Sequence, residues 1–186
     1  MQGGDIVIGS TLVFDLETKR LAQEVGGWSN IDKLGLAAAV LLVVETDETH
    51  RFVEQDAEEL IGQLLKADQV VGFNIVRFDY QVLRPYGLTP GPDLIGRTVD
   101  LLDHIYQSLG YRVSLDNLAE ATLGERKSAD GLAAVKWYRE GKLDQVLDYC
   151  EQDVRITHRL WEYGRQNGQI KYRDREFGLH TLPVSW

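Results

Sequence analysis

The sequence predicts an α/β domain in which helices cover a mixed β-sheet. Strand-like segments come first along the chain and helix-like segments come later. An almost wholly apolar strand, residues 11–17 (TLVFDLE), stands close to the start and is typical of a central strand buried on both faces. No repeat, low-complexity tract or linker divides the 186 residues, so we expect one domain over residues 1–186.

The first half of the chain supplies the expected strands. After the central strand, the turn-forming residues 24–33 predict a loop. Runs of β-branched and other apolar residues then predict further strands at residues 34–46, 51–54, 69–74 and 98–101. The connections between the early strands are short, which favours antiparallel neighbours.

The expected helices dominate the second half. Asp56 can cap a helix whose apolar residues recur at helical spacing, at Leu60, Ile61, Leu64 and Leu65. Further helices are expected at residues 78–86, 103–109, 115–123, 130–140 and 143–166. The tail, residues 168–186, is expected to form a strand or a loop packed on the domain.

Composition limits the class of protein. The chain is 44% hydrophobic and 26% charged, which is ordinary for a globular protein. It has no run of about 18 apolar residues, so we expect no membrane span. Residues 1–10 lack the features of a signal peptide. A single cysteine, Cys150, excludes an internal disulfide framework and suits a reducing compartment, so we expect a cytoplasmic protein.

The net charge of −9 bears on nucleic-acid binding. Proteins that bind phosphates by charge alone usually present a basic surface. An enzyme whose carboxylates hold cations is a different case, because the metal ions meet the phosphate. The charge therefore excludes neither class.

Asp15 and Glu17 are the strongest local signal. Residues two apart on a strand point to the same face. Two like charges at the end of an apolar strand repel each other, and one divalent cation satisfies both. The alternative is an ordinary strand end.

Three further residues are weaker signals when taken one at a time. Tyr149 and Asp153 are four apart, so a helix places them on one face. Asp79 opens a helix, where an aspartate is favoured in any case by the helix dipole. Acidic residues at a strand end, at a strand–helix junction and on a late helix can nevertheless converge on one pocket, which suits hard cations with oxygen ligands.

Together these segments resemble the three motifs of the DEDD superfamily of exonucleases. The first motif, Asp-x-Glu, matches residues 14–18 (FDLET). The second matches residues 72–79 (GFNIVRFD), and the third, Tyr-x-x-x-Asp, matches residues 149–153 (YCEQD). Residues 114–127 between them also resemble the family, and the likeness runs over residues 11–161. The resemblance implies a ribonuclease-H-like fold, a mixed β-sheet flanked by α-helices.

The third motif indicates the branch of that family. The histidine branch has its histidine five residues before the last aspartate, where this chain has Asp148. The tyrosine branch has tyrosine four residues before, where this chain has Tyr149. The chain thus resembles the tyrosine (DEDDy) branch, which includes proofreading domains of family-B DNA polymerases and stand-alone predicted exonucleases.

The resemblance implies a mechanism with two divalent cations, Mg²⁺ or Mn²⁺. Asp15, Glu17 and Asp153 are then ligands of the first cation. Asp15 bridges to the second, and Asp79 holds that ion mostly through water. Tyr149 orients the attacking water. The implied reaction is 3′→5′ hydrolysis of phosphodiesters to nucleoside 5′-monophosphates.

The resemblance also implies substrate contacts and partners. Leu16, Asn74 and Phe78 are the implied substrate-binding residues, although Asn74 equally suits a turn and Phe78 suits the core better than a stacking platform. The implied partner is a single-stranded 3′ end, with DNA favoured over RNA, and a polymerase or helicase partner fits the same family. No membrane partner is expected.

Other readings of the sequence stay open. An exoribonuclease that trims RNA 3′ ends carries the same motifs, and a catalytically silent binding domain would share the fold. Trp28 either stacks on a base or packs in its loop. A basic stretch, Arg126, Lys127, Lys136, Arg139 and Lys142, either tracks a phosphate backbone or is a solvated helical face.

Overall fold

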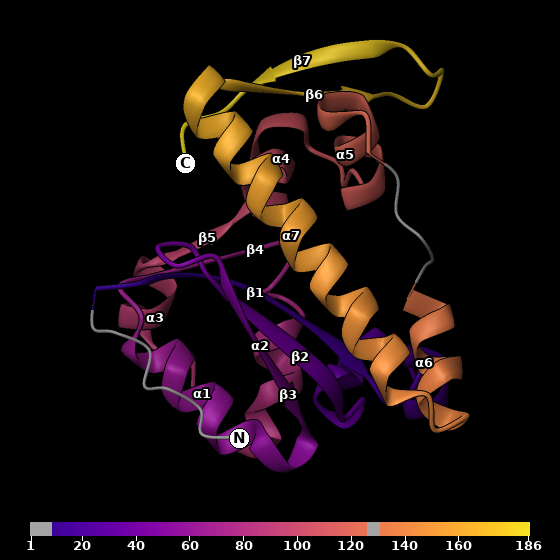
Figure 1. The fold of residues 1–186 in the computed structure, drawn as a ribbon. Coiled ribbons are helices and arrows are strands. Elements are labelled where there is room, and N and C mark those ends of the chain that lie inside the picture. The colour runs from indigo at the N-terminus through magenta and orange to yellow at the C-terminus, as the bar shows by residue number, and fades with distance from the viewer. Residues whose placement is uncertain (1–8, 126–130) are drawn as a thin grey trace.

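The computed structural model describes residues 9–125 and 131–186 (Figure 1). Arg126, Lys127 and the predicted helix start at Asp130 lie outside the described residues. Five strands form one sheet in the order β3-β2-β1-β4-β5. The strands are β1 (Thr11–Thr18), β2 (Leu36–Val43), β3 (Glu48–Val53), β4 (Gln69–Gly72) and β5 (Thr98–Asp100).

The sheet is mixed, as predicted. β1 pairs antiparallel with β2, and β2 pairs antiparallel with β3. β4 runs parallel to β1 and β5 runs parallel to β4. β1 is the central strand, and its Leu12, Val13 and Phe14 are fully buried. The carboxylates that follow on β1 therefore start from the most buried part of the sheet.

Alternation along β1 assigns its side chains to two core layers. Leu12, Phe14 and Leu16 join one apolar cluster, whereas Val13 joins the other. The first layer contains α1 (Ala57–Lys66) and α2 (Asp79–Leu83). Because side chains alternate across a strand, Asp15 and Glu17 share the face of Val13, which the second layer covers.

The second layer consists of α4 (Leu101–Leu109), α5 (Leu115–Leu123) and α7 (Leu143–Asn167). Figure 1 shows α7 as one long helix that crosses the sheet and reaches the C-terminal strands. α6 (Gly131–Arg139) lies beside it and packs on Leu147 and Tyr149 of α7. The single helix α7 thus extends from the acidic end of β1 to the C-terminal strands.

The C-terminal strands, β6 (Gln169–Arg173) and β7 (Leu179–Pro183), form a separate two-stranded sheet. Side chains of α5 cover the outer edge of β6 and form hydrogen bonds with its backbone, as a neighbouring strand would. The Asn117 side chain accepts from Arg173 N at 2.8 Å and donates to Arg173 O at 2.9 Å. Thr122 Oγ1 likewise accepts from Lys171 N and donates to Lys171 O. The backbone groups of Lys171 and Arg173 on this edge are therefore satisfied.

The outward face of α7 is tied to β3 by an ion-pair network. Glu151 accepts from Arg51 Nη2 at 2.7 Å and from Arg155 Nε at 3.0 Å. Thr49 Oγ1 also donates to Glu151, and Arg51 reaches Asp148 at 2.7 Å. The network fixes the position of α7 over the antiparallel edge of the sheet.

Several local predictions differ from the structure. Residues 24–33, expected as a loop, contain 3₁₀ turns at Ala22–Val25 and Trp28–Lys33. The helix expected at residues 78–86 is α2 followed by a 3₁₀ turn, Arg84–Tyr86, because a proline stands at position 85. A short helix, α3 (Pro92–Gly96), was not predicted.

Two predictions around α1 were also wrong. Asp56 precedes the helix, but its Oδ2 accepts from Val53 N at 2.9 Å rather than from an amide inside the helix. Leu65, expected on the buried side, is 49% exposed. None of the helices in residues 9–125 and 131–186 combines the length and apolar character that a membrane span requires.

Candidate active site

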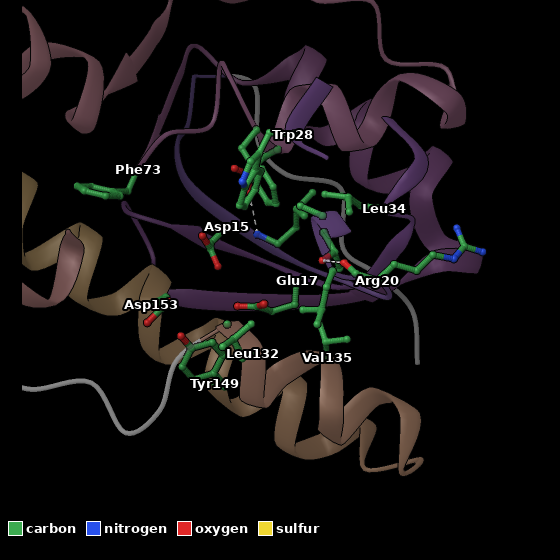
Figure 2. A pocket seen from close by; sticks show the side chains of 17 residues that line it. Asp15, Glu17, Arg20, Trp28, Leu34, Phe73, Leu132, Val135, Tyr149 and Asp153 are labelled. Carbon is green, nitrogen blue, oxygen red and sulfur yellow. Dashed lines mark hydrogen bonds between the residues drawn. The ribbon is translucent and has the colours of Figure 1, made fainter. Parts of the chain in front are cut away.

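A cavity of about 360 Å³ opens where the end of β1, the start of α2 and the helices α6 and α7 meet. Figure 2 shows its side chains. Its walls are mostly apolar, and the predicted acidic residues project between them. The lining residues used below are Asp15, Leu16, Glu17, Arg20, Trp28, Phe73, Phe78, Asp79, Leu132, Tyr149 and Asp153.

Three carboxylates converge in this cavity. Asp15 and Glu17 come from β1, and Asp153 comes from the facing side of α7. One ligand atom from each lies within 4.8 Å of the others. Carboxylate oxygens are the ligands that Mg²⁺ and Mn²⁺ prefer, so the donor set fits a hard divalent cation.

Asp79 lies in the same cavity but is held differently. It is 2% exposed at the start of α2, and its Oδ1 accepts from Leu16 N at 3.0 Å. Burial, and then the nearby charge of Asp15, raises the pKa of Asp79 well above its usual value. Among the described residues, the group within 4.8 Å contains three acids and not Asp79. A cation near Asp15 would offset the repulsion that Asp79 experiences there.

Tyr149 stands one helical turn before Asp153 on α7. It is 4% exposed, and its ring packs edge-on against Trp137 with centroids 6.0 Å apart. Figure 2 shows Tyr149 and Asp153 on the same side of the cavity, facing the carboxylates of β1. The spacing of four residues therefore brings both side chains to one place, as a helix requires.

Cys150 of α7 contacts Asp15, which the sequence alone did not indicate. Its thiol donates to Asp15 O at 3.3 Å and lies 3.6 Å from Asp15 Oδ2. Burial, and then the charges of Asp15 and Glu17, raises the pKa of the Cys150 thiol well above its usual value. The thiol thus stays protonated and serves as a hydrogen-bond donor to β1.

Asp100 is a second residue that sequence reasoning missed. It is buried at the end of β5 and accepts from Asn74 N at 2.8 Å and from Val76 N at 3.0 Å. It also accepts from Leu102 N at 3.1 Å, which caps α4. One carboxylate therefore fixes the turn between β4 and α2 on which Asp79 depends.

The three residues expected to bind substrate have different positions. Leu16 and Phe78 line the cavity, Leu16 being 3% exposed. Asn74 is not among the described lining residues. It has a φ of 70°, and its carbonyl accepts from Phe78 N, so it has the turn geometry that was the alternative expectation.

Two exposed apolar side chains at the cavity lie outside the predicted set of site residues, although base stacking was one of the two alternatives for Trp28. Trp28 is 71% exposed and packs on Phe78 with ring centroids 6.3 Å apart. Leu132, on α6, is 61% exposed. Large exposed apolar side chains that gather at a cavity mark a ligand surface more often than a packing defect.

The sequence as a whole identifies the family. Residues 12–164, a span from β1 into α7, match the RNase_H superfamily. The chain belongs to the RNase_H superfamily. No curated protein matches it by sequence.

Solved structures with a similar fold include two of exonuclease I. One is 16% identical and is matched over 85% of this chain and 41% of its own, with a TM-score of 0.47. The other, an ExoI/SSB-Ct complex, is 17% identical over 96% of this chain and 52% of its own, with a TM-score of 0.43. This RNase_H superfamily chain spans about half the length of those proteins or less. Membership of the tyrosine branch stays a prediction.

Proposed function

We propose that this protein is a metal-dependent 3′→5′ exonuclease that releases nucleoside 5′-monophosphates, with DNA favoured over RNA. The observation that carries the proposal is the convergence of Asp15, Glu17 and Asp153 within 4.8 Å in a cavity with apolar walls. Membership of the RNase_H superfamily supports the same chemistry.

The acidic residues divide between two cation positions. Asp15, Glu17 and Asp153 would hold one cation, and Asp15 and Asp79 would hold the other, Asp79 mostly through water. Bound Mg²⁺ or Mn²⁺ supplies Lewis acidity toward the phosphodiester and lowers the pKa of a coordinated water. The donor set contains oxygen atoms only, which favours these two ions over softer metals.

The remaining residues of the cavity position the substrate. Tyr149 orients the attacking water through its hydroxyl, because it lies one turn from Asp153 and faces the β1 carboxylates. Leu16 and Phe78, which line the cavity, contact the terminal nucleotide. A volume of about 360 Å³ stands at the small end of the range for ligand sites, so the cavity accommodates a single nucleotide unit.

End-labelled strands test the proposal. DNA and RNA labelled at either the 3′ or the 5′ end are incubated with Mg²⁺ or Mn²⁺. The expected result is early release of labelled mononucleotide from the 3′ end only, and no release by Asp15→Ala. Glu151→Gln, which changes a carboxylate on the outward face of α7, is the matched control and stays active.

The outcomes separate the alternatives. Faster release from RNA than from DNA would replace the favoured substrate by RNA 3′ ends. Release from the 5′ end, or no release with either metal, would overturn the proposal. Binding of a strand without hydrolysis would favour a silent binding domain.

A further inference from the structure

An arginine and a tyrosine lie together on the surface outside the cavity. The Arg77 guanidinium stands 5.6 Å from the centre of the Tyr106 ring. The Arg77 side chain is 62% exposed and Tyr106 is 40% exposed. Both groups are thus available to a ligand, and a cation above an aromatic face is a combination that single-stranded nucleic acids commonly contact.

The pair is attached directly to the wall of the cavity. Arg77 belongs to the turn between β4 and α2, and this turn also supplies Phe73 and Phe78 to the cavity lining. Tyr106 lies on α4, whose first turn is held by the same Asp100 carboxylate that holds the turn. The surface pair therefore has a fixed place relative to the carboxylates.

The direction from the cavity to the pair matters. In Figure 2, Phe73 projects on one side of Asp15, whereas Glu17 and Arg20 lie on the other. A strand cut at the carboxylates has its terminal nucleotide on one side and its retained part on the other. Because the cavity accommodates a single nucleotide, the retained part has to leave it, and Arg77 belongs to the same turn between β4 and α2 as the lining residues Phe73 and Phe78.

The present partner of Arg77 is one that a phosphate can replace. Asp103 Oδ1 lies 3.6 Å from Arg77 Nη2, and the Asp103 side chain is 38% exposed. Ion pairs this exposed contribute little to stability, because water and salt screen them. A phosphate offers the guanidinium a bidentate partner instead.

We propose that Arg77 and Tyr106 form a second subsite that binds the retained part of a single-stranded nucleic acid. Arg77 meets a backbone phosphate, and Tyr106 stacks on a base. The inference rests on the proposed exonuclease function and extends it beyond the terminal nucleotide. It makes the affinity of the enzyme depend on the length of the strand.

Substrate length tests the subsite. Arg77→Ala and Tyr106→Ala are each expected to raise KM about tenfold for strands of about 12 nucleotides, with kcat unchanged. KM for a dinucleotide should rise much less, since a dinucleotide leaves only one nucleotide outside the cavity. Arg165→Ala is the matched control: Arg165 lies 4.6 Å over the Trp161 ring and pairs with Glu162 at 3.1 Å. It should change neither value.

Asp103→Asn gives a prediction of the opposite sign. Removing the competing carboxylate should lower KM for the long strand, because Arg77 is then free to meet phosphate. If the pair between Arg77 and Asp103 only supports the fold, Asp103→Asn and Arg77→Ala should lower the melting temperature together and leave KM alone. That result would overturn the subsite.

A binding measurement separates this inference from the exonuclease proposal. Fluorescence anisotropy of a labelled strand of about 12 nucleotides needs no hydrolysis. Arg77→Ala should weaken binding and reduce the dependence of log K on log salt by about 0.7. Equal binding and equal slope in the wild type and Arg77→Ala would overturn the subsite even if hydrolysis is observed. Absent hydrolysis with the expected change in slope would overturn only the exonuclease.

Discussion

The two faces of α7 hold acidic residues in opposite ways. On the outward face, Glu151 and Asp148 contact arginines of α7 and β3. Although burial alone would raise it, the hydrogen bonds from Arg51 and Arg155 hold the pKa of Glu151 below its ordinary value. These carboxylates have protein cations as partners, which is the pattern of a structural network.

On the inward face of α7, the acidic residue lies among other carboxylates. Asp153 lies with Asp15 and Glu17, and the pKa of Asp79 is raised by burial and then by Asp15. Arg20 is the one basic residue among the described residues of the cavity lining, and its Nη1 donates to Lys33 O at 2.7 Å. An acidic group gathered in this way suits a cation from solution. Among the described residues, the inward carboxylates gather with one another, whereas the outward ones pair with arginines.

The largest expected difference between the faces is in catalysis. Asp153→Asn should lower kcat at least about a thousandfold, because it removes a cation ligand from the reacting centre. Glu151→Gln, two residues earlier on the same helix, should keep kcat within about threefold, because its change is confined to the outward network. Single-turnover rates on a 3′-labelled strand measure both. Similar losses in the two variants would remove the distinction between the faces.

The second-largest expected difference between the faces is in how much a bound metal ion stabilises the folded protein. A metal ion at about 100 times its dissociation constant should add about 2.7 kcal/mol to the free energy of unfolding of the wild type and of Glu151→Gln. Asp15→Ala should lose this increment, because the folded state then binds the ion weakly. Thermal melts in EDTA and in Mn²⁺ provide the comparison. An increment that survives in Asp15→Ala would place the cation elsewhere.

Tyr149→Phe sharpens the comparison within the inward face. Loss of the hydroxyl should lower kcat about tenfold, since a water is then oriented less well. The Mn²⁺-dependent rise in melting temperature should persist, because no cation ligand is lost. Full activity would remove Tyr149 from the mechanism, and loss of the metal effect would make it part of the cation site.

The smallest expected effect is on the outward face. Glu151→Gln should lower the free energy of unfolding by about 1 kcal/mol, because its arginine partners are partly exposed and screened. Urea unfolding at low and high salt measures this value. The difference from wild type should shrink in high salt. A difference that is independent of salt would indicate lost packing rather than lost charge.

The strand pattern and the acidic motifs could be read from the sequence because they depend on local periodicity. Asp15 and Glu17 share a face of β1 simply because they are two residues apart. Tyr149 and Asp153 share a face of α7 because they are four apart. The antiparallel pairing of β2 with β3 agrees with their short connection, whereas β1 and β2 pair in the same way although residues 19–35 separate them.

What the sequence could not indicate depends on contacts between distant segments. Asp79 is aimed at Leu16 N, a residue 63 positions away, and nothing near it in the chain signals that partner. Asp100 looked like the end of a strand, yet it holds a turn 24 to 26 positions earlier. Trp28 is 71% exposed, and its ring packs on Phe78, which is distant in the chain.

The side chains of α5 along β6 have a consequence for self-association. A free strand edge is a template on which other chains can add and build aggregates. Asn117 presents a donor and an acceptor together, as a peptide group does, and Thr122 repeats the arrangement at Lys171, two positions earlier on β6. On this side the small sheet ends in side chains rather than in open backbone. A foreign strand would have to displace a helix before it could add there.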